Sequence, residues 1–293
     1  MEQHSIKFRK DNTCDRDKVK KLLYPYRKYK VAVVQLNSGE DKEKNLERAQ
    51  HLINQATIEG AKIIALPESF IYRGKDITSP QVAENISGRA ITSLSTLAKE
   101  LEIYILAGSI YESIPNEKKV YNTSILIDNQ GAVKAIYRKI HLFDVTLPNG
   151  LEVKESTHLL TGKDITTVQT DIACLGLSIC FDLRFPELYR ELTLLGSELI
   201  FVPSNFTLNT GKDHWEILLR ARAIENQVYI IAPNQCGLDV GKGYKSYGHS
   251  MIVDPWGKIL AEKEADEGVI TSEIDLDHLR EVRKRLPCLG LVK

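Results

Sequence analysis

The segment LGLSICFDLRFPEL, residues 175–188, places a cysteine where a nucleophile would be useful. The pattern predicts that a buried strand ends before Cys180 and that a helix follows it. Such a turn exposes the side chain and directs backbone N–H groups to the same point, and a helix N-terminus favours a thiolate. Cysteine is also among the most frequently buried residue types, so a structural role for Cys180 stays open at this point.

A thiolate nucleophile needs a base and a group that stabilises an oxyanion. Histidine is the usual base, and the candidates are His141, His214 and His249, none of which the sequence singles out. Glu68, in ALPESF, follows a predicted buried strand and a proline. It is therefore either a solvated loop carboxylate or a base held at the edge of a sheet.

Two further charged residues belong to a long predicted loop, residues 140–162, and to the strand before it. Lys139, in YRKIHLFD, ends that strand. Its ammonium could protect an exposed edge strand or stabilise a developing oxyanion. Glu155, in VKESTHLLTG, lies within the loop and by itself indicates a solvated carboxylate. A loop of this length inside a compact domain is usually functional.

The elements that position these residues alternate irregularly. Residues 30–36 (KVAVVQL) and 62–68 (KIIALPE) read as buried strands, with an amphipathic helix from Asp41 to Gly60 between them. Elsewhere, helices separate some strands while others follow one another directly. This order predicts an α+β fold with mixed sheets and outer helices. Residues 1–29 are predicted to form a charged N-terminal arm, and residues 30–293 a single domain.

Bulk composition narrows the class of protein. Among 293 residues, Lys plus Arg and Asp plus Glu both total 39, so no overall field attracts nucleic acid or an anionic membrane. No apolar run approaches the roughly 20 residues of a membrane span, and the N-terminus lacks the apolar stretch of a signal peptide. Five scattered cysteines without a C-x-x-C pair argue against a disulfide framework or a zinc site. A cytoplasmic location is expected.

In combination, these segments resemble the nitrilase superfamily of carbon–nitrogen hydrolases. The resemblance spans about residues 30–290, and its motifs occur in order: LPESF with Glu68, YRKIHLFD with Lys139, KES with Glu155 and GLSICFDLRFPEL with Cys180. Segments 210–237 and 247–260 are similar to later blocks of the family. The branch with omega-amidase and deaminated-glutathione amidase is most similar. True nitrilases usually have Trp after the nucleophile, whereas this chain has Phe181.

The resemblance implies a four-layer α-β-β-α sandwich that forms a homodimer or a higher homo-oligomer. It implies that Glu68 is the general base, Cys180 the nucleophile, and the Lys139 ammonium with the Phe181 backbone N–H the oxyanion site. Glu155 would orient Lys139 or the hydrolytic water. No metal or organic cofactor is implied.

The resemblance also implies substrate-binding residues. Arg184 would bind a substrate carboxylate, unless it forms a structural ion pair with Asp182 or Glu187, and Thr210 is a second candidate. The expected function is a cysteine-dependent amidase. It would hydrolyse a small carboxylate-bearing ω-amide, of the deaminated glutathione or α-ketoglutaramate type, to acid plus ammonia through a thioester. The alternatives are an N-carbamoyl hydrolase or nitrilase on the same scaffold, or a non-catalytic interaction module.

Overall fold

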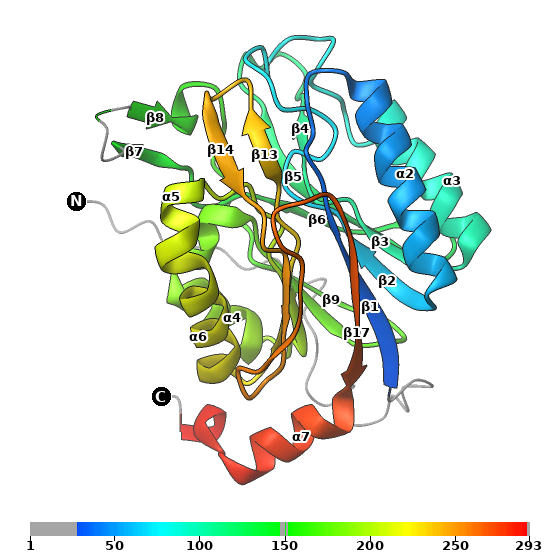
Figure 1. The fold of residues 1–293 in the computed structure, drawn as a ribbon, viewed down its shortest axis with the longest axis vertical. Coiled ribbons are helices and arrows are strands. Elements are labelled where there is room, and N and C mark those ends of the chain that lie inside the picture. Colours follow the sequence, from blue (N-terminus) through cyan, green and yellow to red (C-terminus); the bar gives the residue numbers. More distant parts are fainter. Residues whose placement is uncertain (1–27, 147–149, 151, 292–293) are drawn as a thin grey trace.

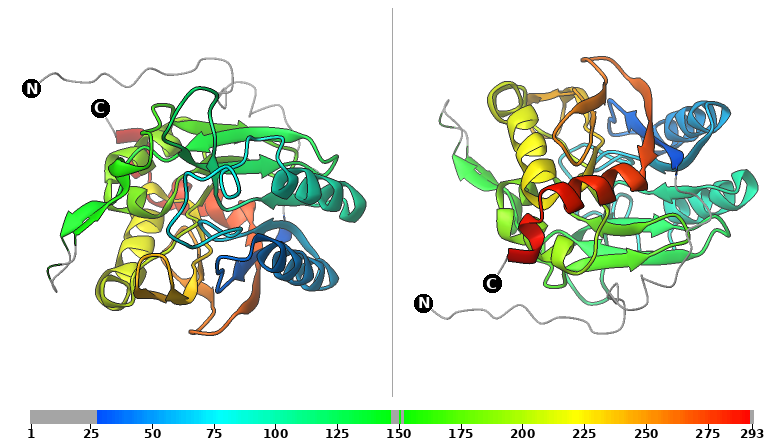
Figure 2. Two further views of the ribbon diagram at one scale, coloured as in Figure 1. Left: turned by 90° about the horizontal axis from the view of Figure 1, so that it is seen from above. Right: turned by 90° about the horizontal axis from the view of Figure 1, so that it is seen from below.

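The computed structural model describes residues 28–146, 150 and 152–291. Two β-sheets face each other, and helices cover the outer face of each sheet (Figure 1). Seen along the sheets, α2 and α3 lie on one side of the molecule and α4 and α6 on the other (Figure 2). The structure therefore has the predicted α+β architecture, a four-layer α-β-β-α sandwich.

The first sheet contains both parallel and antiparallel neighbours. Its order is β17-β1-β2-β3-β5-β4, and β6 also pairs with β5. Helices α2 (Lys42–Ile58) and α3 (Arg89–Leu101) pack on its outer face. The strands are β1 (Lys28–Gln35), β2 (Ala61–Ala65), β3 (Tyr104–Leu106), β4 (Ile110–Glu112), β5 (Tyr121–Ile127), β6 (Val133–Arg138) and β17 (Gly268–Asp275).

The second sheet is also mixed, with parallel strands at its centre. Its order is β16-β15-β12-β11-β10-β9. Helices α4 (Pro186–Leu194) and α6 (Glu216–Asn226) cover it. The strands are β9 (Thr166–Gln169), β10 (Cys174–Leu177), β11 (Leu199–Phe201), β12 (Tyr229–Ala232), β15 (Met251–Val253) and β16 (Ile259–Glu262).

Strand β1 shows why the sequence favours this layering. Val31 and Val33 belong to the core between the sheets, whereas Ala32 and Val34 belong to the core beneath α2 and α3. Successive strand residues point to opposite faces, so residues 31–34 of β1 are buried on both faces and this part of the strand is continuously apolar. Burying each valine contributes about 1.5–3 kcal/mol.

Helix α2 follows its sequence signals closely. The Asp41 side chain accepts a hydrogen bond from the Lys44 backbone N–H at 3.1 Å and so caps the first turn. The predicted apolar stripe is buried against the sheet at Leu46, Ala49 and Ile53. Beyond the helix, Gly60 adopts φ +89°, a conformation that favours glycine.

Three parts of the predicted element order need correction. The long loop at 140–162 contains a hairpin of β7 (Asp144–Thr146) and β8 (Glu152–Lys154), followed by the short 3-10 helix η2 (Glu155–Thr157). The hairpin of β13 (Cys236–Asp239) and β14 (Tyr244–Tyr247) precedes β15. Strand β17 is also present, and it pairs along all of β1 before α7 (Leu276–Arg285). Most residues of β17 are half-buried, and its sequence has no long apolar run that would have predicted a strand.

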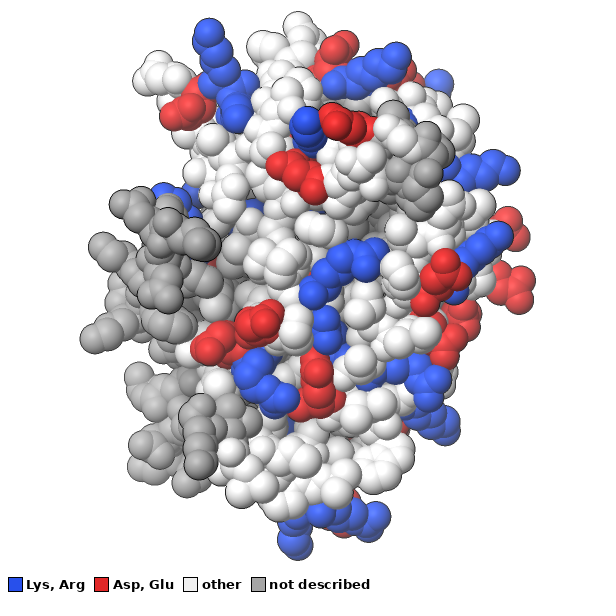
Figure 3. Space-filling view, turned by 90° about the vertical axis from the view of Figure 1, so that its left-hand side faces the viewer, with Lys and Arg blue, Asp and Glu red and all other residues white. Residues whose placement is uncertain are grey.

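Several other expectations concern the ends and the surface. Residues 1–27 of the predicted arm lie outside the described residues, and β1 begins at Lys28, so the division into arm and domain stays a prediction. In the described part of the chain, no helix is long and apolar enough to cross a membrane. Positive and negative side chains are interspersed on the face in Figure 3.

The cysteines differ in state. Cys180, Cys236 and Cys288 are free thiols. Cys174, buried in β10, is disulfide-bonded, which the scattered spacing of the cysteines did not indicate.

Candidate active site

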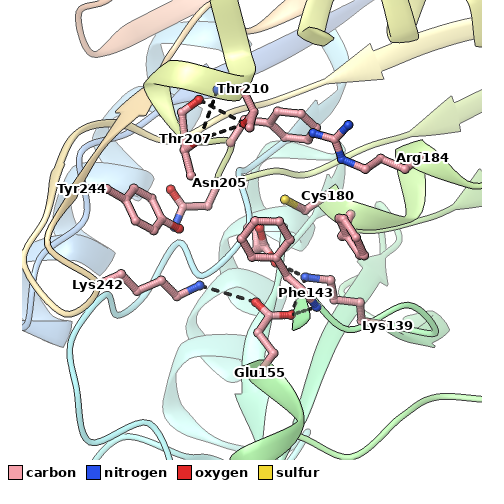
Figure 4. A pocket seen from close by; sticks show the side chains of 13 residues that line it. Lys139, Phe143, Glu155, Cys180, Arg184, Asn205, Thr207, Thr210, Lys242 and Tyr244 are labelled. Atoms are coloured by element: carbon pink, nitrogen blue, oxygen red, sulfur yellow. Dashed lines mark hydrogen bonds and ion pairs between the residues drawn. The ribbon is translucent and has the colours of Figure 1, made fainter. Parts of the chain in front are cut away.

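The four predicted catalytic residues line one pocket between the sheets' ends and the hairpins (Figure 4). All four side chains are buried. The lining residues are Glu68, Lys139, Phe143, Glu155, Cys180, Phe181, Arg184, Asn205, Phe206, Thr207, Thr210, Lys242 and Tyr244.

Cys180 occupies a turn between β10 and the short 3-10 helix η3 (Cys180–Arg184). Its backbone has φ +49°, which is uncommon for a residue other than glycine. Its N–H donates to the Pro203 carbonyl at 3.0 Å. Backbone conformations of this kind persist where the surroundings impose them, often at functional sites. The predicted turn after the strand is present, but the Cys180 side chain is buried in the pocket and not exposed, and α4 begins only at Pro186, after η3.

Asp182 connects this turn to the strand end that bears Lys139. Its buried carboxylate accepts hydrogen bonds from the Ile179 N–H at 2.8 Å and from the Tyr137 hydroxyl at 2.7 Å. The other oxygen accepts from the His141 N–H at 3.1 Å and contacts the His141 Nδ1 at 2.7 Å. Tyr137 and His141 flank Lys139 in sequence, so one carboxylate fixes two parts of the pocket relative to each other.

Lys139 is at the centre of the charged groups. Its side chain is 1% exposed, and its Nζ lies 3.1 Å from Glu68 Oε1 and 2.9 Å from Glu155 Oε2. Burial by itself would lower the pKa of Lys139, but the Glu155 and Glu68 carboxylates raise it well above its ordinary value. Lys139 is therefore an ammonium at neutral pH, as an oxyanion-stabilising role requires.

Glu155 is not the solvated carboxylate that its isolated segment indicates. Its Oε2 also accepts from the Phe143 N–H at 2.9 Å, and its Oε1 lies 3.4 Å from Lys242 Nζ. Burial would raise the pKa of Glu155, but Lys139 and Lys242 lower it to about 2. Because so weak a base accepts a proton poorly at neutral pH, this geometry suits an orienting group.

Glu68 has a different set of partners. Its Oε1 accepts from Asn122 Nδ2 at 2.8 Å in addition to Lys139, and its backbone carbonyl accepts from Gln235 Nε2 at 2.9 Å. Burial raises the pKa of the Cys180 thiol well above its ordinary value, the adjacent Glu68 carboxylate raises it further, and Lys139 opposes them. The resting cysteine is thus a thiol, and the Glu68 carboxyl group lies beside it.

None of the three histidine candidates lines this pocket. His141 contacts Asp182 and stacks on Phe185 with ring centroids 3.6 Å apart. His249 contacts Glu262, and His214 contacts Arg184. The geometry therefore favours Glu68 as the partner of the Cys180 thiol.

Both predicted substrate-binding residues line the pocket. The Arg184 guanidinium carbon lies 5.5 Å from the Phe206 ring centroid and 5.9 Å from that of Phe181. Its two terminal nitrogens are each 3.3 Å from His214 Nδ1. Asp182 accepts hydrogen bonds from other groups, and no ion pair joins Arg184 to a carboxylate within the described residues. Thr210 Oγ1 lies 2.8 Å from Thr207 Oγ1.

The sequence did not indicate several lining residues. Lys242 and Tyr244 come from the β13–β14 hairpin, which was not predicted, and Asn205 follows β11. No sequence motif includes these residues. The two glycines around Lys242, in GKGY, indicate a turn but do not indicate that it lies near the site. In the described part of the chain, no cluster of three or more His, Cys, Asp or Glu side chains could hold a metal ion.

Comparisons with known proteins agree with this geometry. The family model described as carbon-nitrogen hydrolase matches residues 30–284. A deaminated glutathione amidase from Synechocystis is 41% identical over 264 residues, covering 89% of this chain and 97% of the relative. The human omega-amidase NIT2 is 39% identical over 259 residues, covering 88% of this chain and 93% of the relative.

Among solved structures, Saccharomyces cerevisiae Nit3, a member of branch 10 of the nitrilase superfamily, is similar with a TM-score of 0.81. It is 36% identical, and the match covers 91% of this chain and 96% of that one. The predicted family and fold class are thereby confirmed, and the chain belongs to the carbon–nitrogen hydrolase family of the nitrilase superfamily.

Proposed function

We propose that the protein is a cysteine-dependent amidase that hydrolyses a small carboxylate-bearing ω-amide to an acid and ammonia through a thioester. The observation that carries this proposal is the continuous contact from Glu68 through Lys139 to Glu155 beside the Cys180 thiol, in one pocket. The names of the relatives from Synechocystis and human support the choice of an amide as substrate.

In the proposed reaction, Glu68 accepts the thiol proton while the Cys180 sulfur attacks the amide carbonyl carbon. The Lys139 ammonium and the Phe181 backbone N–H stabilise the oxyanion. Glu68 then transfers its proton to the nitrogen, the C–N bond breaks, and ammonia leaves a thioester on Cys180. A water molecule attacks the thioester, Glu68 accepts its proton, and that proton returns to the sulfur when the acid departs.

The opposite part of the pocket is suited to the acid end of the substrate. Arg184 presents a planar guanidinium to the pocket, and burial lowers the pKa of this group. Among the residues that the structure describes, no carboxylate pairs with it. A carboxylate would supply the missing charge in a bidentate contact, with Thr210 as a further hydrogen-bond donor. Substrates of the α-ketoglutaramate class have such a carboxylate and release ammonia, and substrates of the deaminated glutathione class also have one but release an amine in its place.

We also propose a cytoplasmic location and a homodimer or higher homo-oligomer. Three exposed apolar side chains support self-association, with exposed fractions of 69% at Ile217, 52% at Ile224 and 57% at Trp256. Sedimentation equilibrium of the purified chain tests the oligomer, where a monomer mass at micromolar concentration would refute it. Cell fractionation tests the location.

The central experiment measures ammonia release from succinamate. Cys180→Ala should abolish turnover while the protein stays folded, and Glu68→Gln should lose at least about 100-fold in kcat, as expected for a general base. The matched controls are Cys236→Ala, another buried free thiol, and His249→Ala, a histidine outside the pocket that contacts Glu262. Turnover that survives in Cys180→Ala, or loss in His249→Ala with Glu68→Gln unaffected, would contradict the assignment.

A further inference from the structure

Asn122, in β5, is a buried polar residue that contacts Glu68 but is not among the residues that line the pocket. Its amide nitrogen Nδ2 donates a hydrogen bond to Glu68 Oε1 at 2.8 Å. Asn122 is 2% exposed and Glu68 is 3% exposed, so this contact lies away from bulk water. The proposed mechanism gives Asn122 no role, although its side chain touches the group that transfers the proton.

The alternation of β5 explains why Asn122 faces the site. Successive side chains of a strand point to opposite faces of its sheet. Ile125 and Ile127 belong to the core beneath α2 and α3, whereas Leu126 belongs to the core between the sheets. Asn122 lies on the same face of the strand as Leu126, so it points between the sheets. A buried position of this kind is usually filled by an apolar side chain.

The orientation of the Asn122 amide is fixed by its neighbours. The reverse orientation would place Oδ1 against Glu68 Oε1, and two acceptor oxygens cannot form a hydrogen bond with each other. In the observed orientation Oδ1 is buried, and within the part of the chain that the structure describes it has no hydrogen-bond partner. An unpaired buried oxygen lowers the stability of the fold. Folding alone therefore does not explain an asparagine here, whereas its contact with Glu68 does.

The hydrogen bonds to the Glu68 carboxyl group divide its two oxygens. Within the described residues, the side chains that donate to this group are those of Asn122 and Lys139, and both reach Oε1. Lys139 Nζ lies 3.1 Å from that oxygen. Two donors directed at Oε1 disfavour a proton on it and leave the lone pairs of Oε2 for the thiol proton.

The backbone of Asn122 also contacts Lys139. The Lys139 N–H donates to the Asn122 carbonyl at 2.9 Å, so one residue contacts Glu68 through its side chain and Lys139 through its main chain. A substitution that keeps the backbone conformation leaves the contact with Lys139 in place. Replacing the Asn122 side chain therefore tests its contact with Glu68 alone.

We propose that Asn122 is a positioning residue that holds Glu68 Oε1 and thereby directs Oε2 to the Cys180 thiol. This inference rests on the proposed amidase function. The thiol proton passes to Glu68 Oε2 and from there to the leaving nitrogen, while the hydrogen bond from Asn122 stays on Oε1. Because the amide is neutral, it orients the carboxyl group without exchanging a proton with it.

The experiment measures activation of the thiol separately from amide hydrolysis. Iodoacetamide alkylates thiolates, so its rate of reaction at Cys180 reports how readily Glu68 removes the thiol proton, without an amide substrate. Mass spectrometry after digestion follows each cysteine in its own peptide. Cys236, another buried free thiol, is the internal control, because its alkylation accelerates if the fold opens.

Asn122→Leu keeps the approximate shape of the side chain and removes its amide. Alkylation of Cys180 and kcat for succinamate should both fall about tenfold to hundredfold, with KM and the alkylation of Cys236 nearly unchanged. The urea-unfolding midpoint should stay near the wild-type value, since losing the hydrogen bond and losing the unpaired oxygen have opposite effects. The matched control is Ser124→Ala, which removes a hydroxyl buried on the same face of β5 and should change neither rate.

A double variant decides whether Asn122 acts through Glu68. In the Glu68→Gln background, Asn122→Leu should slow the alkylation of Cys180 no further, because the base is already absent. The inference is overturned if the two losses multiply, or if Asn122→Leu alone alkylates within about twofold of wild type. Loss of the folded state in both Asn122→Leu and the smaller Asn122→Ala would make Asn122 structural and would also overturn it. Failure of the wild-type protein to hydrolyse succinamate would instead refute the proposed function, since alkylation requires no amide.

Discussion

Replacing Asp182 with Asn should slow catalysis without weakening substrate binding. Asp182 is absent from the pocket lining, so the substitution removes no contact with substrate. Its carboxylate instead joins Ile179, beside the nucleophile, to Tyr137 and His141, on either side of Lys139. A displacement of about 1 Å between attacking and stabilising groups can cost about 100-fold in rate. We therefore expect kcat to fall about that much while KM changes little.

The expected loss of stability follows from the number of hydrogen-bond acceptor oxygens, which is two in the Asp182 carboxylate and one in an Asn amide. The carboxylate serves the Ile179 N–H and the Tyr137 hydroxyl with one oxygen and the two His141 nitrogens with the other. An Asn amide has only one carbonyl oxygen, so in either orientation a buried peptide N–H faces an NH₂ group. An unpaired buried donor costs about 1–3 kcal/mol, and the remaining hydrogen bonds lose their charge assistance. The total should be roughly 3–5 kcal/mol of unfolding free energy.

Urea unfolding measures the free energy, and steady-state kinetics on succinamate separate kcat from KM. Tyr137→Phe is the milder companion: it removes one hydrogen bond to the carboxylate and should cost about 1.5–3 kcal/mol, with a smaller loss in kcat. Glu187→Gln, at an exposed carboxylate in the first turn of α4, is the control and should change neither quantity. A folded Asp182→Asn protein with wild-type kcat would show that Asp182 stabilises the fold but does not position the reacting groups.

The remaining predictions concern Glu155 and Arg184. The pKa of Glu155 in the folded protein is about 2, below its ordinary value of 4.5, so its stabilising contribution is fully present above pH 4.5 and is lost as pH falls toward 2. This lowering corresponds to roughly 3 kcal/mol, and Glu155→Gln should flatten the acid limb of urea-unfolding stability between pH 5 and 2 by that amount. An unchanged slope would contradict the ionised pair. Arg184→Gln should lower kcat/KM for succinamate about tenfold to hundredfold and leave hydrolysis of neutral butyramide nearly unchanged. Equal losses on both amides would make Arg184 structural.

Much of the fold and the centre of the site could be predicted because the relevant signals are local. Apolar runs predict β1 and β2, and the Asp41 cap and Gly60 delimit α2. The motifs around the four expected catalytic residues occur at strand ends or just beyond them, so a two-sheet fold can bring these residues together even though the sequence separates them widely. Their roles in catalysis stay predictions until the variants are measured.

The parts that could not be predicted depend on long-range pairing. Strand β17 is half-buried and mixed in polarity, and its partner β1 lies at the other end of the described chain. Tyr137 and Asp182 are 45 positions apart in the sequence, and neither residue type by itself predicts a buried hydrogen bond. Lys242 lies between two glycines, in a segment that the sequence would predict to be a solvated turn. Hydrogen bonds from Arg73 and to Asp239 hold its hairpin so that Lys242 lies at the pocket.

The different surroundings of the two carboxylates explain how one site can hold two glutamates around a single lysine and give them different roles. Both contact the Lys139 ammonium, but their other partners differ in charge. Glu155 has a second cation, Lys242, and a peptide N–H, all of which stabilise its ionised form. Glu68 has the neutral amide of Asn122 and the adjacent thiol. A proton carrier must accept and release a proton during one turnover, and we expect Glu155, with two cations beside it, to be the less suited of the two to that role. Because Lys242 helps to keep Glu155 ionised, we expect proton transfer to fall to Glu68.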